Sequence, residues 1–525
     1  MQGNAQINLN WCPFCGGRLK PTTKVKEITY EGKPLNIHKN EYREFQETGL
    51  LRYLDGPRSH PFSQDFVDLS IILSVSVAVG LYFLWTITNL GAYAGARRRR
   101  NTFISQSLRF RPAFTLKLVG TEAELYESFS DMPVIDAHEH LAPERVRVEQ
   151  HLDVFDLFIH YTKTDFHCAG MTPAQWERMH NVEIPDEKRW RILSRYLKEI
   201  RHGSYARPAL IYARHLGFDD ITKDNYKDIS RALQADNRPG IYRKILVDMC
   251  NIRTALTQAG RTDYDLPFMV PLMPMDNWGN VRAWKAIEDR ASEVGEGANT
   301  IDEYLEAARK GLERWKEEGA VGIKMISLPY DAPDRSRAVA IFDELRRDPG
   351  KKVPEMNPLR SYLNEELLDI AAEVGLVVAV HTGVWGDFRQ LDPRHMIPIF
   401  GRHPGTKFDM YHMGMPWVRD AGLIGKNNPN VWLNLCWCHI VSPEMTVSAL
   451  KEWIDMVPMN KIIGFGGDYG KPVEKVYGHL IMAKENIAGV LGERIDRELM
   501  GRSEAEGIAR KWFYTNPKRL YGLKA

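Results

Sequence analysis

From about residue 112 to the end of the chain, short apolar runs alternate with longer segments of helical periodicity. One such segment places Tyr304, Ala308, Leu312 and Trp315 three or four residues apart, on one face of a helix. Strands that alternate with helices predict a parallel sheet with right-handed crossovers, and eight such units favour a closed (β/α)8 TIM barrel over an open sheet. The eight predicted strands are Val134–His138, Ile252–Leu256, Phe268–Leu272, Val321–Ile326, Leu376–His381, Lys407–His412, Val431–Leu435 and Ile462–Gly466.

The interval between the first and second predicted strands is unusually long. Residues 141–250 contain three segments with helical periodicity, Pro185–Ile200, Tyr205–Leu216 and Asn225–Ala235. A structureless loop of this length would argue against a barrel, but a helical subdomain does not. We therefore predict a helical insertion after the first strand. It should cover the C-terminal mouth of the barrel, where active sites of this fold lie, and contribute substrate contacts.

Histidines and one aspartate stand at the ends of several predicted strands. His138 and His140 are two residues apart, so on an extended segment they point to the same face. His381, His412 and Asp468 each end an apolar run of their own. Imidazole and carboxylate groups suit zinc or a similar divalent ion. We predict that His138, His140, His381 and Asp468 bind one metal ion, with His412 close by.

The same residues suggest catalytic roles. A catalytic metal site keeps a position open for water and lowers the pKa of that water. Asp468 can then accept a proton, and His412 can polarise the reacting oxygen of a substrate.

With these ligands the chain resembles the amidohydrolase superfamily, and within it the amidohydrolase-related (amidohydrolase 2) group. The resemblance covers roughly residues 130–525. Besides the strand-end histidines it rests on four further motifs: His412-Met413-Gly414, the segment 428–434 that leads into the seventh strand, Gly467-Asp468-Tyr469, and the closing segment 516–523.

This resemblance implies a centre with one or two metal ions. In binuclear relatives a lysine on the fourth strand is carbamylated and bridges the ions, and Lys324 occupies that strand here. In mononuclear relatives a similar Gly-x-Lys does not ligate. We expect one ion, for which the ligands favour zinc, and treat Lys324 as the candidate ligand of a second.

Three hypotheses for the function remain open. The first is hydrolysis of a C–N or C–O bond in a small molecule by metal-bound water, which fits relatives with histidines on both strands five and six. The second is decarboxylation or isomerisation, because the long insertion resembles that of the uronate isomerases. The third is a membrane-tethered binding module without catalytic activity, although a binding module has no need of this complete ligand set.

Residues beyond the strand ends suggest what the substrate contacts. Arg389 can pair bidentately with a carboxylate, which suits a carboxylated substrate, although a surface salt bridge is an equally natural role. Cys436 and Cys438 flank Trp437 in a spacing that can bind metal, but they end an apolar strand, and we interpret them as packing residues. The four candidates for substrate contact are Trp385, Arg389, Trp437 and His439.

Residues 1–66 form a polar N-terminal extension with a partial zinc-ribbon-like motif. Cys12-Pro13-Phe14-Cys15-Gly16-Gly17 has the form of one zinc knuckle and looks like the start of the ribbons on some antitoxin proteins. No second CxxC follows. Cys12 and Cys15 are therefore candidate ligands of a structural zinc, and a polar appendage without metal is the alternative.

Residues 67–100 combine an apolar run with a basic flank. Residues 69–96 contain no charged side chain, and they exceed the roughly 20 residues that span a bilayer. Four arginines follow at 97–100, so a membrane span would leave the catalytic domain in the cytoplasm. The alternative is a buried helix or apolar linker of a cytoplasmic enzyme.

Composition narrows the partners further. A formal net charge of +2 gives no overall reason to expect nucleic-acid binding. Six cysteines in 525 residues do not form a disulfide framework. We expect a small-molecule substrate, and a homo-oligomer is compatible with the sequence.

Overall fold

The computed structural model describes residues 114–524 and the backbone of two short strands, β1 (Val25–Tyr30) and β2 (Lys33–His38). The chain divides into two units, residues 1–110 and 111–525. In the first unit, β1 and β2 form an antiparallel pair with Val25 opposite His38. The predicted zinc knuckle at Cys12 and Cys15 and the predicted span at residues 69–96 lie outside the described residues. Among the helices that are described, none is long and apolar enough to cross a membrane.

The second unit contains an eight-stranded parallel sheet whose spatial order follows the sequence from β3 to β10. Each expected strand is present, which confirms the predicted barrel. The sixth and eighth strands are shorter than predicted. The strands are β3 (Val134–Glu139), β4 (Ile252–Thr257), β5 (Met269–Pro274), β6 (Gly322–Ile326), β7 (Val377–His381), β8 (Phe408–Met410), β9 (Val431–Asn434) and β10 (Ile462–Ile463).

The extended segment that follows β10 closes the barrel against β3. The amide of Ala137 donates to the carbonyl of Phe465 at 3.1 Å, and the amide of Asp468 donates to the carbonyl of His138 at 2.7 Å. The amide of His140 then donates to the carbonyl of Tyr469 at 3.0 Å. The first and last strands therefore meet, and the residues beyond them come together at one end of the barrel.

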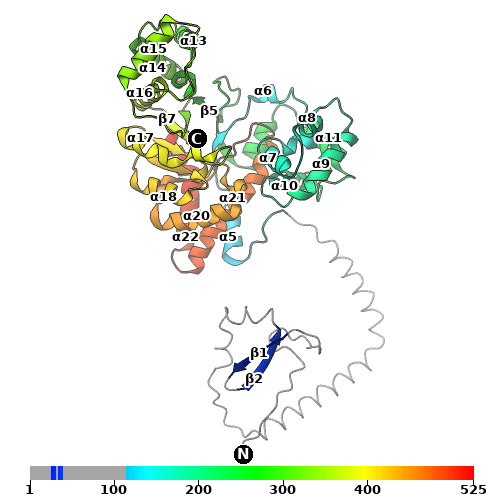
Figure 1. The fold of residues 1–525 in the computed structure, drawn as a ribbon. Helices are drawn as coiled ribbons and strands as arrows, with labels where there is room; N and C mark the ends of the chain where they lie inside the picture. Colours follow the sequence, from blue (N-terminus) through cyan, green and yellow to red (C-terminus); the bar gives the residue numbers. More distant parts are fainter. Residues whose placement is uncertain (1–24, 31–32, 39–113, 525) are drawn as a thin grey trace, which may run out of the picture. The chain divides into compact units, whose positions relative to one another are not determined.

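Helices surround the barrel, and two crossovers carry more than one long helix. In Figure 1 the helices between β5 and β7 gather as one group beside the strands. The main helices outside the insertion are α5 (Gly120–Ser128), α13 (Trp284–Glu293), α14 (Ile301–Glu317), α15 (Arg335–Arg347), α16 (Pro358–Val374), α17 (Ile397–Arg402), α18 (Val418–Asn427), α19 (Cys438–Val441), α20 (Pro443–Met456), α21 (Glu474–Asp496), α22 (Arg502–Arg510) and α23 (Asn516–Tyr521).

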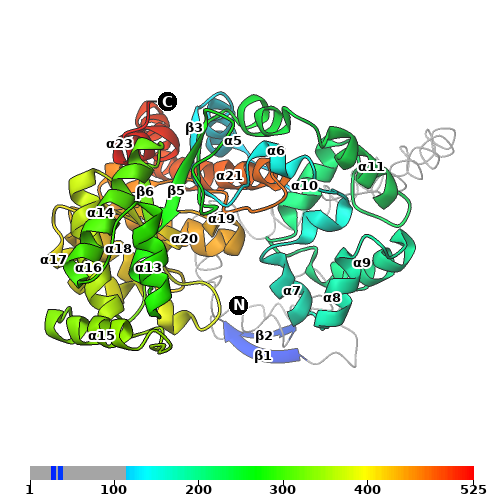
Figure 2. The ribbon, with the colours of Figure 1, turned by 90° about the horizontal axis from the view of Figure 1, so that it is seen from above.

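The insertion after the first strand is helical, as predicted. Its later helices gather in a lobe beside the barrel (Figure 2). The lobe is tied to α21 by a buried ion pair between Arg147 and Glu474, which are 3% and 1% exposed. Its helices are α6 (Glu144–Arg147), α7 (Thr162–Cys168), α8 (Pro173–His180), α9 (Asp186–Ile200), α10 (Arg207–His215) and α11 (Tyr226–Asp236).

The interior of the barrel changes from apolar to polar along its axis. Leu520, Tyr521 and Leu523 from the end of the chain form a cluster with buried strand residues such as Ile135 and Leu256. The Tyr521 hydroxyl donates to Asp409 Oδ2 at 2.7 Å, and burial raises the pKa of Asp409 to about 7. This buried hydrogen bond begins a polar layer that leads toward the strand ends.

Gly322 on β6 offers a test of how closely the barrel strands pack. A Cβ on Gly322 would lie 2.5 Å from the backbone oxygen of Val377 and 3.0 Å from Leu272 Cδ2. Because a backbone oxygen cannot rotate away, Gly322→Ala should lower the free energy of unfolding by about 1–3 kcal/mol. Gly507→Ala on α22 is the matched control, because no atom lies within 4 Å of its added Cβ. The close approach of β6 to β7 would be contradicted if urea unfolding showed Gly322→Ala to be as stable as the parent.

Candidate metal centre and active site

Two imidazoles and one carboxylate converge where β3 meets the segment after β10. His138 Nε2 lies 3.1 Å from His140 Nε2 and 3.4 Å from Asp468 Oδ1. His140 Nε2 lies 3.1 Å from the same carboxylate oxygen. His138 and Asp468 are 0% and 1% exposed. The closure of the barrel therefore brings together three of the four residues that the sequence predicted as ligands.

The donor atoms of this group suit a divalent cation. His140 Nδ1 donates to the carbonyl of Gln258 at 2.7 Å, which leaves the lone pair on Nε2 and directs it toward Asp468. Asp468 Oδ1 is buried and makes no well-formed hydrogen bond. Three electron-pair donors that face one another without intervening protons repel, and a cation placed between them removes the repulsion. The residues present thus fit the metal that the sequence predicts.

The other two predicted histidines lie beside this group. His412 Nε2 is 3.1 Å from His381 Nδ1, and their rings are 4.5 Å apart. His412 Nδ1 donates to the carbonyl of Cys436 at 2.9 Å, which fixes the ring orientation. His381 is not part of the three-residue group formed by His138, His140 and Asp468. Its role as a direct ligand remains a prediction.

A thiol that the sequence analysis assigned to packing belongs to the site. Cys436 joins His412 and Asp468 in a second group whose donor atoms lie within 4.8 Å of one another. The signal in the sequence was its position just after the seventh strand, where side chains of a barrel turn toward the mouth.

Three site residues have left-handed backbone conformations. His412 has φ 66°, Trp437 has φ 65° and Asp468 has φ 58°. Each residue lies in the turn after β8, β9 or β10. Such a conformation costs a non-glycine residue about 1–3 kcal/mol, and it occurs preferentially at functional sites. The turn at His412 also corrects one prediction. His412 lies beyond β8 and is not the last residue of the strand, as the sequence had predicted.

Burial controls the protonation of the site. It lowers the pKa of His138 and of His381 well below the usual value, and that of His412 to about 4. Burial alone would raise the pKa of Asp468, but the close contact with His140 and the other neighbouring imidazoles hold it well below its usual range. At neutral pH the site therefore offers neutral imidazoles and an ionised carboxylate, which is the protonation state that metal binding requires.

Lys324 on β6 lies beside His138, inside the barrel. Its Nζ is 2.8 Å from His138 Nε2 and 4.6 Å from the centre of the Tyr411 ring. Burial lowers its pKa. The position is compatible both with a lysine that lines the barrel and with a ligand of a second ion, so the alternative that the sequence leaves open stays open.

Two buried carboxyl groups hold the loop of Asp468 against β3. Asp136 Oδ1 accepts from the amide of Gly467 at 2.9 Å, and Glu139 Oε2 accepts from the amide of Tyr469 at 2.6 Å. A Cβ on Gly467 would lie 1.9 Å from Glu139 Oε1, so only glycine allows this approach. Burial raises the pKa of Asp136 to about 6 and that of Glu139 well above its usual value. These residues position the carboxylate of Asp468.

The insertion contributes aromatic residues to the mouth of the barrel. The Tyr161 ring stacks on Trp385 at 4.0 Å, and His160 contacts Trp437 edge-on at 5.2 Å. The indole nitrogen of Trp437 donates to the Tyr205 hydroxyl at 3.3 Å. The sequence analysis predicted contacts from the insertion but did not name His160, Tyr161 or Tyr205.

The four predicted substrate contacts separate into two pairs. Trp385 and Trp437 form the aromatic wall just described. Arg389 is 80% exposed and makes a bidentate ion pair with Asp387. His439 is buried, with Nε2 2.9 Å from the carbonyl of Gly464 and Nδ1 3.1 Å from the amide of Asn486. For Arg389 and His439 the structure therefore favours the surface salt bridge and the packing role over substrate contact.

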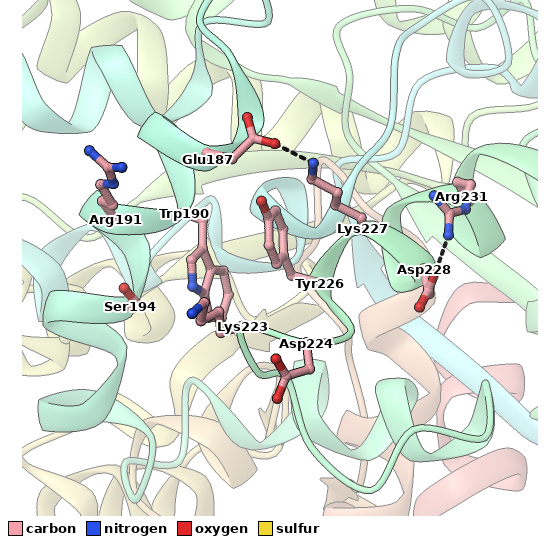
Figure 3. Close-up of a pocket in the computed structure, with 10 residues that line it drawn as sticks. All are labelled: Glu187, Trp190, Arg191, Ser194, Lys223, Asp224, Tyr226, Lys227, Asp228 and Arg231. Atoms are coloured by element: carbon pink, nitrogen blue, oxygen red, sulfur yellow. Dashed lines mark hydrogen bonds and ion pairs between the residues drawn. The ribbon is translucent and has the colours of Figure 1, made fainter.

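A separate hollow of about 700 Å³ lies between α9 and α11 in the insertion (Figure 3). Trp190 and Tyr226 stack there at 4.6 Å. Ion pairs join Glu187 to Lys227 and Asp228 to Arg231 across its rim. None of the metal-site residues lines it, so we assign it no part in the chemistry.

Comparison with known proteins agrees with this geometry. A model of the amidohydrolase family matches residues 135–523, which are most of the chain. The chain belongs to the amidohydrolase family. The resemblance inferred from the strand-end motifs is thereby confirmed, and the site described above is that of an amidohydrolase-type barrel.

Three relatives show how far the similarity extends. Protein fluG of Emericella nidulans is 27% identical over 146 residues, which are 26% of this chain and only 17% of that protein. Uronate isomerase of Thermotoga petrophila is 20% identical over 447 residues, covering 76% of this chain and 96% of that protein. The crystal structure of uronate isomerase from Thermotoga maritima has a TM-score of 0.64 at 18% identity, covering 77% of this chain and all of that one. At this identity the structural match shows the shared fold.

The metal group can be tested without knowledge of the substrate. We expect the purified protein, after dialysis against metal-free buffer, to retain about one divalent ion through His138, His140 and Asp468. Elemental analysis of a His138→Ala/His140→Ala variant should show that this ion is lost, because two of its three donors are gone. His439→Ala is the matched control, since both nitrogens of His439 bond to protein. Full metal content in the double variant would place the ion elsewhere.

Proposed function

We propose that this protein is a metal-dependent isomerase that acts on a small hydroxylated carboxylic acid, in the manner of a uronate isomerase. The observation that carries the proposal is that the helical insertion supplies Tyr161, which stacks on Trp385, and Trp385 in turn contacts the rings of His381 and His412. His160 of the insertion contacts Trp437 beside them. Relatives that match nearly their whole length to this chain, insertion included, are uronate isomerases. The identity is low, so the assignment depends on the site.

Interconversion of an aldose and a ketose transfers hydrogen between neighbouring carbons and between their oxygens, with no water consumed. It therefore needs groups that accept and return protons on an enclosed substrate. A divalent ion held by His138, His140 and Asp468 would polarise a substrate oxygen. Asp468 supplies an ionised carboxylate that can accept a proton.

The residues of the insertion supply the complementary groups. Burial lowers the pKa of His160 to about 4, so its imidazole is neutral at pH 7. Burial raises the pKa of Tyr161 above its usual value, so its phenol remains protonated and can donate. In this proposal the stacked rings of Tyr161 and Trp385 limit the access of water to this side of the site. Exclusion of water favours isomerisation over hydrolysis.

A cation that could anchor a substrate carboxylate lies between the insertion and the barrel. Lys475 is 1% exposed, its Nζ is 3.3 Å from Thr162 Oγ1, and it sits 5.3 Å from the centre of the Tyr469 ring. Burial lowers its pKa to about 7. In this proposal Lys475 takes the role that the sequence analysis gave to Arg389.

Hydrolysis of a C–N or C–O bond is the second candidate. It is supported by the presence of both His381 and His412 beside the metal group, because histidines on both strands five and six fit the hydrolytic relatives. Here Asp468 would accept a proton from water in place of a proton from substrate.

Product masses separate these reactions. The protein should be incubated with glucuronate and galacturonate and, in parallel, with lactones, amides and aromatic carboxylates. Isomerisation leaves the substrate mass unchanged and forms a ketose, hydrolysis adds one water, and decarboxylation removes CO2. Turnover of lactones or amides with added water, without any ketose from the uronates, would refute the isomerase and support the hydrolase.

The role of Asp468 can be measured on whichever substrate turns over. Asp468→Asn keeps the side-chain shape but cannot accept a proton, so kcat should fall by about 10²–10⁴-fold. Asp165→Asn, the same change at a partly buried carboxylate on α7, serves as the matched control. Normal turnover in the Asp468 variant would leave Asp468 with a purely structural role.

Substitution of Lys475 tests its predicted role in substrate binding. Lys475→Met should raise KM for a carboxylated substrate by roughly 10-fold or more, as expected when a charged hydrogen bond of about 1.5–3 kcal/mol is lost. A neutral analogue without the carboxylate should be unaffected, and Lys475→Arg should restore part of the affinity. Equal losses for charged and neutral substrates would show that Lys475 only supports the packing of α7 on α21.

A further inference from the structure

Cys436 lies just after β9, between the two sides of the candidate metal centre. Its Sγ, a ring nitrogen of His412 and a carboxylate oxygen of Asp468 lie within 4.8 Å of one another, and all three residues are buried. The cysteine is not an isolated thiol. It shares Asp468 with the group of His138 and His140, and a different histidine completes its own group.

The surrounding structure holds these donors in place. The amide of Cys436 donates to Asn434 Oδ1 at 2.8 Å, which fixes the turn after the strand. The carbonyl of Cys436 accepts from His412 Nδ1, so the free lone pair of that imidazole is on Nε2. A Cβ on Gly466 would lie 2.9 Å from Cys436 Cβ and 3.1 Å from Sγ. The glycine therefore leaves space that the thiol needs.

A second observation points to a bound cation. Asp468 is 1% exposed and belongs to both groups of donors, and its Oδ1 makes no well-formed hydrogen bond. A carboxylate buried without such a partner is costly unless a cation neutralises it. Asp468 has a second oxygen, so it can serve one ion on each side.

We propose that His412, Cys436 and Asp468 form a second cation subsite that binds a thiophilic divalent ion such as zinc or cobalt(II). Sulfur, nitrogen and oxygen donors together suit this class of ion better than magnesium or calcium. When the ion binds, a metal–sulfur bond forms and the thiol proton leaves to solvent. This subsite differs from the bridging role considered for Lys324, because its ligands come from the turns after strands six, seven and eight.

Cobalt(II) provides a direct readout, because a thiolate bound to it gives a charge-transfer band in the near ultraviolet. The full-length protein should carry Cys12→Ser and Cys15→Ser, so that the thiols of the N-terminal extension do not contribute. We expect the band to appear as the second equivalent of cobalt(II) is added. Absence of the band in this otherwise native protein would overturn the proposal, independently of how any further variant folds.

Two cysteine variants assign the band. In the same background, Cys436→Ser should abolish it and weaken the second equivalent by at least the roughly 10- to 100-fold that loss of even an outer-shell partner costs. Cys438→Ser is the matched control, since Cys438 is equally buried and its Sγ donates to the carbonyl of Cys436 at 3.3 Å. Loss of the band with Cys438→Ser and its retention with Cys436→Ser would also overturn the proposal.

The inference rests on the proposed function only in that the first ion is expected at His138 and His140. The His138→Ala/His140→Ala variant separates the two. It should lose the first equivalent and keep the thiolate band. Because the readout is metal binding and not turnover, the subsite stands or falls whatever reaction the enzyme catalyses.

Discussion

The contact between β3 and the segment after β10 is the interaction on which the rest of the structure depends. The same backbone hydrogen bonds that close the barrel place His138 and His140 against Asp468. Asp136 and Glu139 strengthen the contact by accepting from the amides on either side of Asp468. Closure of the fold and assembly of the metal group are therefore one event, and a change that opens this seam removes the site as well.

Much of the fold and part of the site could be predicted because their signals are local. Each strand is a short apolar run bounded by turns, and a barrel brings all C-terminal strand ends to one mouth whatever the order of its loops. That constraint suffices to gather His138, His140 and Asp468 from positions more than 300 residues apart. It could not settle whether His381, the last residue of β7, joins that group or lies beside it, because a strand end places a residue at the mouth without fixing its side-chain contacts.

The features that were missed depend on contacts with no local pattern. Cys436 reads as a packing residue because its neighbours are apolar, and only the left-handed turn at Trp437 shows that the chain reverses beside Asp468. His160 and Tyr161 come from an insertion whose orientation no periodicity specifies. Arg389 has the right chemistry for a carboxylate, but Asp387, two residues before it, already satisfies its guanidinium. The ion pair with this near neighbour in the sequence replaces the predicted contact of Arg389 with a substrate.

The division of labour between barrel and insertion explains why the family alone does not fix the reaction. The barrel supplies donors and one ionised carboxylate, and this set can activate water or polarise a sugar oxygen equally well. What differs between those reactions is whether water reaches the site and which groups return the proton. In the proposed reaction, His160 and Tyr161 of the insertion would supply the proton-carrying groups, and the stacked rings of Tyr161 and Trp385 would limit the access of water. The left-handed turns at His412, Trp437 and Asp468 cost about 1–3 kcal/mol each, and the packing around these buried residues must offset that cost. If the proposed function holds, the insertion selects the chemistry of a site whose metal donors all come from the barrel.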